Sequence, residues 1–313
     1  MPIITQPLAA SDVGAADRIF RLAFGTFLGL PDPLTFGGSA AIVPSRWRAD
    51  PGGMVGAYEN GVLVGVSAVT VWGRFGFLGP VSVRPDRWDQ HIGRQLVASA
   101  MAIMDQRGVR LAGLFTFPQS PKHLALYQAF GFWPQYLTAL MTKPAQSPPV
   151  SVAWTGYSVE PESAQPRCLA ACAALTDAIF PGLDLAAEIR AIAAAGSGET
   201  VLVREGERVT GFAVCHLGEG SEAEAGTVYV KFAAVRPGAG APERFARVLS
   251  ACEHLARERR CQNIVAGVNT ARHDAYRQMA HSGFRTAFIG VAMQRPNQPG
   301  FNRPDCFVLD DWR

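Results

Sequence analysis

Residues able to do chemistry gather between Val83 and Leu96, where an apolar stretch gives way to a loop and then to a helical pattern around Gly93. The first turn of a helix has N–H groups without partners and carries the positive end of the helix dipole, which suits a bound pyrophosphate. Gly93 has no side chain, so a ligand can approach the backbone closely there. One glycine in such a place is also typical of an ordinary loop, and the segment alone does not establish a site.

A second segment, Leu126-Tyr-Gln-Ala-Phe-Gly-Phe132, places a phenol in a short amphipathic helix that ends at a glycine. A tyrosine phenol has a pKa of about 10, so it stays neutral at pH 7 and can donate a proton or a hydrogen bond. The other interpretation is a core aromatic residue, because Leu124 and Phe130 neighbour Tyr127 at helical spacing.

Together the two segments resemble the GNAT family of N-acetyltransferases. That family has a strand ending in V-x-P, a Q/R-x-x-G-x-G/A loop, and later an L-Y-x-x-x-G-F helix end. Aligning the patterns places the last loop glycine on Gly93, with Trp88 where the family has Gln or Arg and His91 where it has the middle glycine. The helix-end motif is complete from Leu126 to Phe132.

The resemblance implies that acetyl-CoA lies between two strands that splay apart, and that an amine attacks the thioester directly. Proximity of the bound substrates supplies much of the rate, and a strand N–H can stabilise the oxyanion. The resemblance assigns the protonation of the thiolate to Tyr127 and involves no metal. The residues expected to bind the coenzyme are Val81, Ser82, Val83, Trp88, Asp89, Gln90, His91, Ile92, Gly93, Arg94, Ser120 and Lys122.

The chain also repeats itself. Val81-Ser-Val-Arg-Pro85 is echoed by Ala233-Ala-Val-Arg-Pro237, and Gly131-Phe132 is echoed by Gly283-Phe284. Both pairs are offset by 152 residues, and a third echo lies upstream of them. Matches in the same order indicate a duplicated domain.

The two copies differ where the chemistry would occur. The offset places Phe245 at the position of Gly93 and Met279 at the position of Tyr127. A phenylalanine would crowd a pyrophosphate, and a methionine cannot protonate a thiolate. The sequence therefore predicts a catalytic first copy and a degenerate second copy.

We predict an α/β (α+β) fold of two tandem GNAT-like domains, each a mixed, mainly antiparallel sheet flanked by helices. The predicted domains are 1–146 and 155–313, joined by a proline-rich linker at 147–154. Domains of one fold in one chain can pack as a pseudo-dimer within a monomer. The final segment, Phe301–Arg313, mixes aromatic and charged residues and either covers the first domain's cleft or docks on the surface.

Hydrophobic periodicity predicts the elements of each copy. In the first copy an amphipathic helix follows Asp12 as N-cap, and the later elements are strands at 54–59, 62–72 and 74–83, a helix at 92–106, a strand at 110–117, a helix at 121–130 and a strand at 136–141. In the second copy we predict helices at 163–179 and 184–195, strands at 200–204, 209–217 and 226–235, a helix at 242–259, a strand at 262–268, a helix at 271–282 and a strand at 286–294.

Composition excludes several classes of protein. Hydrophobic residues make up 48% of the 313 residues, which is ample for packed cores, and a net charge of +3 argues against a dedicated nucleic-acid binder. No apolar run is long enough to span a bilayer, and the N-terminus lacks a signal-peptide pattern, so we predict a cytoplasmic protein without a membrane partner. The six cysteines have no metal-site spacing and are expected to be free thiols.

The predicted activity is transfer of acetyl from acetyl-CoA to an amine of a small molecule or peptide. One alternative is a non-catalytic sensor of acetyl-CoA or another ligand, and another is an interaction module without a nucleotide ligand. The strand from Gly73 to Val83 carries no acidic side chain that could deprotonate the amine. His91 and His123 have a suitable intrinsic pKa and are the remaining candidates for this base. Fold and motif do not select the acceptor.

Overall fold

The computed structural model describes residues 2–145 and 152–313, so most of the predicted linker lies outside the described residues. The first half contains, in order, β1 (Ile3–Pro7), α1 (Val13–Phe27), α2 (Ile42–Ala49), β2 (Met54–Glu59), β3 (Val62–Trp72), β4 (Phe75–Val83), α3 (Ile92–Gln106), β5 (Leu111–Thr116), α4 (Pro121–Gln128) and β6 (Trp133–Pro144). The second half contains β7 (Thr155–Gly156), α5 (Gln165–Asp177), α6 (Ala186–Ala195), β8 (Gly198–Glu205), β9 (Arg208–His216), β10 (Thr227–Val235), α7 (Ala241–Glu258), β11 (Asn263–Asn269), α8 (His273–His281), β12 (Arg285–Arg295) and β13 (Val308–Leu309).

Strands β2 to β4 and helix α3 follow the sequence pattern closely. Apolar residues of α3 recur every three or four positions, and the burial of Ile92, Leu96, Ala100 and Met104 puts that stripe against the sheet. Asp12 precedes α1 as predicted, but its side chain makes no capping hydrogen bond. Its carboxylate instead accepts a hydrogen bond of 2.7 Å from the hydroxyl of Tyr58, which competes with the capping role.

The strands of both halves form one sheet in the order β1-β2-β3-β4-β5-β12-β6-β11-β10-β9-β8-β7, with β13 attached to β10. Among the described strands, β4 with β5 and β10 with β11 are parallel, and the remaining pairs are antiparallel. The predicted mixed, mainly antiparallel sheet flanked by helices is confirmed. The structure adds that the sheets of the two copies are continuous.

The last strand of each half completes the sheet of the other half. Strand β12 lies between β5 and β6, and β6 lies between β12 and β11. Each of these two strands therefore pairs along both edges, which leaves no open edge between the halves. The predicted domain boundary stays a prediction, and β6 and β12 cross between the halves in opposite directions.

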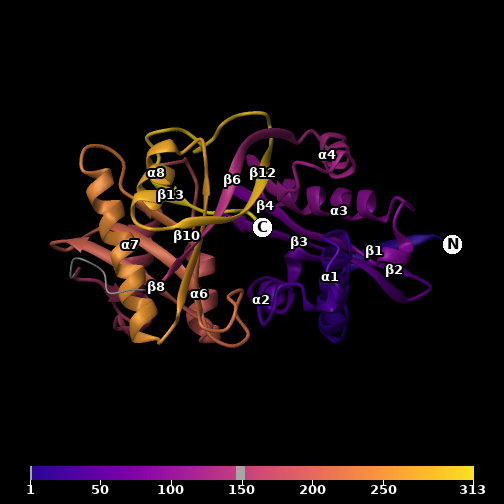
Figure 1. The fold of residues 1–313 in the computed structure, drawn as a ribbon, viewed down its shortest axis with the longest axis horizontal. Coiled ribbons are helices and arrows are strands. Elements are labelled where there is room, and N and C mark those ends of the chain that lie inside the picture. Colours follow the sequence, from indigo (N-terminus) through magenta and orange to yellow (C-terminus); the bar gives the residue numbers. More distant parts are fainter. Residues whose placement is uncertain (1, 146–151) are drawn as a thin grey trace.

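Helices cover both faces of the sheet, and Figure 1 shows α3 and α4 on one face of the first half with α1 and α2 on the other. Side chains of α3 and α4 form one core with Leu78 and Leu114, whereas those of α1 form another with Met54 and Val66. A ligand lying between separated strands of this sheet would therefore meet different side chains on its two sides.

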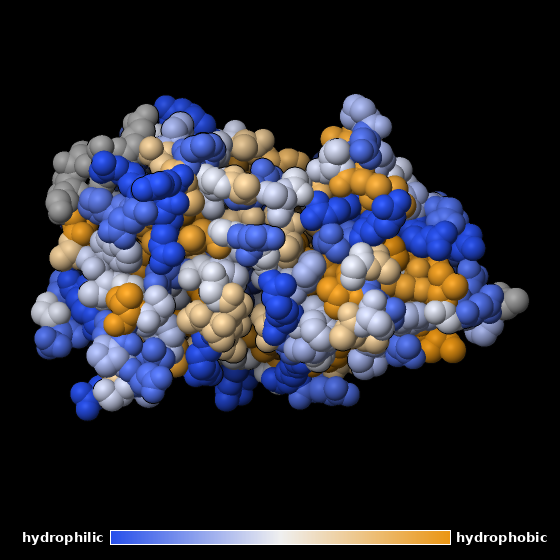
Figure 2. Space-filling model, turned by 90° about the horizontal axis from the view of Figure 1, so that it is seen from below, coloured by the Kyte–Doolittle hydropathy of each residue, from blue (hydrophilic) through white to orange (hydrophobic). Residues whose placement is uncertain are grey.

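The surface shows where apolar residues gather. Figure 2 shows mostly hydrophilic residues on the face that bears α1 and α2, with apolar residues gathered toward the end nearest the N-terminus. None of the described helices combines the length and the apolar character needed to cross a membrane.

Candidate functional site

The loop between β4 and α3 presents a row of backbone donors. A short 3-10 turn, Pro85–Arg87, leads to Asp89 and His91, which both have a left-handed backbone with φ of 63° and 59°. Six consecutive N–H groups, from Asp89 to Arg94, have no acceptor among the described residues. Such a row at the start of a 15-residue helix has the geometry and partial charge that suit an anion.

The side chains of this loop divide into two groups. Trp88 is half-buried and its Nε1 donates to the carbonyl of Val83 at 2.8 Å, which fixes the loop to the end of β4. Asp89 is exposed and forms an ion pair with Lys122 of α4. Ile92 is buried in the core, whereas Gln90, His91 and Arg94 are exposed.

The protein itself imposes no need for a glycine at position 93. The backbone φ there is not in the left-handed region, and an added Cβ would lie 3.7 Å from Leu126 and 4.0 Å from Val83, which are ordinary contacts. The free space above the backbone therefore suits the approach of a ligand to the helix end.

Strands β4 and β5 separate beside this loop. They pair from Phe75 with Leu111 to Leu78 with Leu114, and no further pairing follows along β4. At this point β4 bulges against β3, with Gly79 and Pro80 between the paired residues.

Beyond the bulge lie three predicted coenzyme contacts. Val81 and Val83 are half-buried, and Ser82 is buried with an Oγ that has no partner in the described part of the chain. The opening between β4 and β5 thus lies beside the strand segment predicted to hold the coenzyme.

Tyr127 lies on α4 and its ring packs against Phe132, with ring centroids 6.5 Å apart. Burial raises the pKa of Tyr127 above its usual value, so the phenol stays protonated at neutral pH. Its hydroxyl has no hydrogen-bond partner among the described residues, and the hydroxyl oxygen is not completely shielded from solvent. This hydroxyl is therefore free to donate to a ligand.

The start of α4 fixes two further residues. Ser120 is buried and caps the helix, because its Oγ accepts a hydrogen bond from the N–H of His123 at 3.4 Å. The His123 ring packs at 4.8 Å from Phe27 and 5.9 Å from Phe117. Burial, with the charge of Lys122, lowers the pKa of His123, so its imidazole is neutral at pH 7.

The corresponding positions of the second half have different surroundings. Phe245 and Met279 are both fully buried in the core beneath β10 and β11. The segment Phe301–Arg313 is not docked loosely on the surface, and its end lies beside the bulge of β4, where a Cβ on Gly79 would lie 3.6 Å from Arg313 and 3.7 Å from Trp312. It is inserted into the second half beside β10, where β13 pairs with Ala233 and Ala234.

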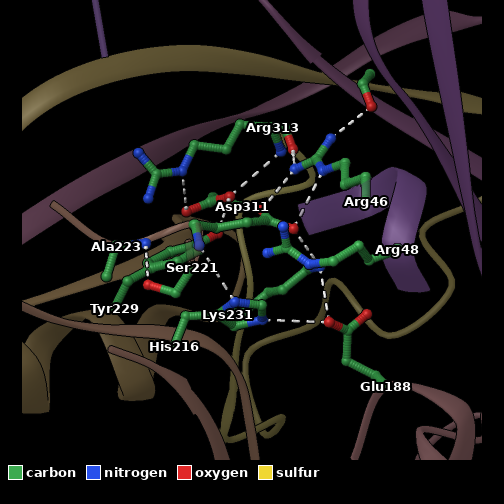
Figure 3. A network of polar contacts seen from close by, with 12 residues as sticks. Arg46, Arg48, Glu188, His216, Ser221, Ala223, Tyr229, Lys231, Asp311 and Arg313 are labelled. Atoms are coloured by element: carbon green, nitrogen blue, oxygen red, sulfur yellow. Dashed lines mark hydrogen bonds and ion pairs between the residues drawn. The ribbon is translucent and has the colours of Figure 1, made fainter. Parts of the chain in front are cut away.

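A buried ion cluster, which the sequence analysis missed, joins the two halves. It consists of Arg46, Glu188, His216, Glu222 and Lys231 (Figure 3). The Lys231 ammonium lies 2.8 Å from a Glu188 oxygen and 2.7 Å from a Glu222 oxygen. Glu188, His216 and Glu222 are close enough to share a metal ion, but the ammonium of Lys231 already binds both carboxylates.

The charges of this cluster fix its protonation states. Burial alone would raise the pKa of Glu188, but the ammonium of Lys231 and the imidazole of His216 outweigh it and lower the pKa to about 2. Arg46 and Lys231 likewise hold the pKa of Glu222 well below its usual value against the effect of burial. Widely separated positions contribute to this cluster, so no local motif could indicate it.

Comparisons with known proteins agree with this geometry. Residues 27–132 match the model of the acetyltransferase (GNAT) family. A putative acetyltransferase from Pyrococcus horikoshii is similar in structure, with a TM-score of 0.69, 14% identity, and coverage of 99% of this chain and 95% of that one. A GCN5-related N-acetyltransferase from Sphaerobacter thermophilus has a TM-score of 0.57 at 15% identity, covering 95% and 96% of the two chains.

A tandem GNAT protein from the clavulanic acid biosynthesis pathway also matches, with a TM-score of 0.57, 15% identity, and coverage of 94% of this chain and 98% of that one. No curated protein matches the chain by sequence. Residues 27–132 therefore belong to the GNAT family of acetyltransferases. The whole chain has the fold of a tandem GNAT protein.

Proposed function

We propose that the first half is an N-acetyltransferase that moves an acetyl group from acetyl-CoA to an amine. The observation that carries this proposal is the row of six unpaired N–H groups from Asp89 to Arg94, located beside the opening between β4 and β5. These donors suit the pyrophosphate of the coenzyme. The pantetheine arm would then lie along Val81–Val83, with the thioester near the bulge at Gly79.

The reaction requires two proton transfers. The amine nitrogen forms a bond to the acetyl carbon, and the bond between that carbon and sulfur breaks. Tyr127 protonates the departing thiolate, which its neutral and unpaired hydroxyl allows. We assign removal of the amine proton to His123, four residues earlier on the same side of α4 and neutral at pH 7.

The acceptor would approach from the face of α1, opposite α3 and the coenzyme loop. The rings there form an aromatic cluster of Phe24, Phe27, Phe36, Phe117 and His123, with ring separations between 4.7 and 6.0 Å. Phe27 and Phe36 are half-buried and so partly accessible. We therefore propose a small-molecule or peptide amine with an apolar body rather than a polycation.

The test combines binding with turnover. Acetyl-CoA is titrated while the melting temperature is followed, and free thiol release is then measured with phenethylamine, spermidine and a lysine-containing peptide. We expect stabilisation, with the fastest thiol release from phenethylamine. Stabilisation without thiol release from any amine would favour a sensor, and no stabilisation would contradict coenzyme binding.

A further inference from the structure

The second half contains the same opening between strands as the first. Strands β10 and β11 are parallel neighbours from Thr227 with Asn263 to Val230 with Ala266, and both strands continue beyond that point without pairing to each other. This matches the four paired positions of β4 and β5 before they separate. The described strands therefore form two equivalent openings, one in each half.

The opening of the second half is filled by the chain itself. Val308 and Leu309 pair with Ala234 and Ala233 of β10, and the N–H of Val235 donates to the carbonyl of Phe307 at 3.3 Å. These are the backbone groups of β10 that a pantetheine arm would need. The segment from Cys306 to Trp312 is buried throughout.

Contacts on the other side confirm that this segment lies between the two strands. A Cβ added to Gly267 of β11 would lie only 2.3 Å from the Cβ of Asp311. The ring of Phe307 packs 5.4 Å from that of Phe245, the residue at the position of the loop glycine. Strand β11 and helix α7 are therefore fitted to the segment.

The segment is also fixed by a buried guanidinium. Arg272, which is fully buried, donates to the carbonyl of Val308 at 2.9 Å and to Asp310 at 2.7 Å, and two of its nitrogens share the side-chain oxygen of Asn302. A charge-assisted set of this kind, shielded from water, resists displacement. The segment is thus part of the folded second half.

The end of the same segment reaches the reacting strand of the first half. A Cβ added to Gly113 of β5 would lie only 2.7 Å from the Trp312 ring. The centroid of that ring lies 5.1 Å from the centroid of the Phe75 ring of β4. Arg46 donates to the carbonyl of Gly79 at 2.5 Å, and its guanidinium also binds the carboxylate of Glu222. Arg46 donates in addition to the carbonyl of Arg313 (Figure 3). Gly79 is the residue at which β4 bulges beside the opening.

We propose that residues 306–313 exclude coenzyme A from the second half, and that this anchored segment, through Arg46, positions the bulge of β4 in the first half. The chain then has one coenzyme site, and the second half serves as a support for it. This inference rests on the proposed function of the first half. Arg46 touches no substrate in this scheme and is a positioning residue.

The first test is the number of coenzyme molecules bound per full-length chain, measured by isothermal titration with acetyl-CoA. We expect one molecule in the native chain, one bound at least about tenfold more weakly in Gly93→Glu, and one in Phe245→Gly, because a widened loop does not remove the inserted segment. Two bound coenzyme molecules per native chain would overturn the exclusion from the second half and leave the proposed function of the first half standing. None in the native chain would overturn the proposed function, and this inference with it.

The second test separates positioning from stability. In Arg46→Lys the charge remains, but an ammonium cannot reach Gly79, Arg313 and Glu222 together. We expect kcat to fall about tenfold or more, since small misplacements of reacting groups are costly, while KM for acetyl-CoA and the bound stoichiometry stay unchanged. The matched control is Arg48→Lys, because Arg48 lies two residues further along α2 and is exposed.

Glu222→Gln provides a second variant, in case Arg46→Lys does not fold. It keeps a hydrogen-bond acceptor for Arg46 but removes the charge, and it lies in the second half. We expect the same fall in kcat at constant KM. A folded variant of either kind, with one bound coenzyme, a lowered melting temperature and native kcat, would overturn the positioning role.

Discussion

We propose a chemical role for Tyr127 because its hydroxyl is neutral, has no partner among the described residues and is not completely enclosed. Tyr127→Phe removes the proton donor and keeps the ring that packs against Phe132. We expect kcat to fall about 100-fold, as for loss of a general acid, with KM for acetyl-CoA unchanged. Steady-state thiol release measures both, and Tyr136→Phe, on an exposed ring of β6, is the control. A native kcat in Tyr127→Phe would exclude the role.

His123 gives the reaction a pH dependence. Its pKa is lowered, first by burial and then by Lys122, so the basic form predominates at pH 7 and is lost as the pH falls through a value below about 6.5. We expect the rate to decrease on the acidic side with a midpoint below that value. In His123→Gln this acidic limb should disappear and the rate at pH 7 should fall about tenfold or more. An acidic limb that persists in the variant would assign the proton to another group.

At this scale the sequence predicted the types of residue but not their surroundings. Tyr127 was proposed from its motif, and the structure supplies the reason why its phenol stays neutral. Ser120 remains a predicted coenzyme contact, and the structure adds that its hydroxyl caps α4. Trp88 was treated as a departure from the family loop, and the structure uses it to fix the loop to Val83. Capping and side-chain packing depend on tertiary neighbours, which spacing alone does not reveal.

The start of helix α3 is the element on which coenzyme binding depends. Gly93→Glu places a carboxylate where the pyrophosphate is expected, in a position whose backbone and neighbours tolerate a side chain. We expect KM for acetyl-CoA to rise at least about tenfold through charge repulsion and steric exclusion, while the melting temperature stays near native.

The control for this change is Gly14→Glu in α1, a helical glycine that is exposed and has no neighbour within 4 Å of an added Cβ. It should leave KM and the melting temperature near native. Equal coenzyme affinity in Gly93→Glu and in the control would contradict a pyrophosphate at α3.

Elements with a clear apolar period could be predicted almost residue by residue, and α3 has the predicted bounds 92–106. Two elements of the first half, β1 and α2, could not be predicted. The first is a five-residue strand at the sheet edge with mostly exposed side chains. The second contains Pro44, and it buries Arg46 for an ion pair with Glu222, which lies 176 residues away. Its buried residues are Val43, Ser45 and Arg46, so polar side chains interrupt the apolar pattern.

At the scale of the whole molecule, the strand exchange makes each half depend on the other. Residues 1–145 alone leave β5 without β12 and β6 without both neighbours. Unpaired edges of this kind promote aggregation. We expect each half expressed alone to be insoluble or poorly folded, and the co-expressed halves 1–145 and 152–313 to form a soluble one-to-one complex. Size-exclusion chromatography and circular dichroism test this, and two separately folded, monomeric halves would contradict it.

The buried ion cluster gives the whole molecule an acid sensitivity. The pKa of Glu188 is about 2 in the folded protein and about 4.3 in an unfolded chain. A lowered pKa contributes stability above the unfolded value, and this stability is lost as the pH falls toward the folded value. We therefore expect the free energy of unfolding to decrease from about pH 5 downward.

The variant Glu188→Gln cannot undergo this titration. Its free energy of unfolding should show a smaller dependence on pH between about 5 and 3 than that of the native chain. Denaturant unfolding at several pH values provides the comparison. An equal slope in the two proteins would show that Glu188 does not contribute to the acid sensitivity.

The continuous sheet could not be read from the repeat, because similarity between two copies shows that each has the same strands and not which copy each strand joins. The 152-residue offset nevertheless aligns the end of β4 at Val83 with the end of β10 at Val235, and the end of α3 with the end of α7, whereas α7 begins three residues earlier than the offset places it.

The crossing of β6 and β12 also bears on ancestry. Two identical chains that had traded their final strands would form a symmetric dimer, and fusing their genes would preserve that trade within one polypeptide. After fusion, neither half could be lost without unfolding its companion, although either could abandon its chemistry. A half that had lost its catalytic residues would then be retained, because the other half needs its exchanged strand to fold.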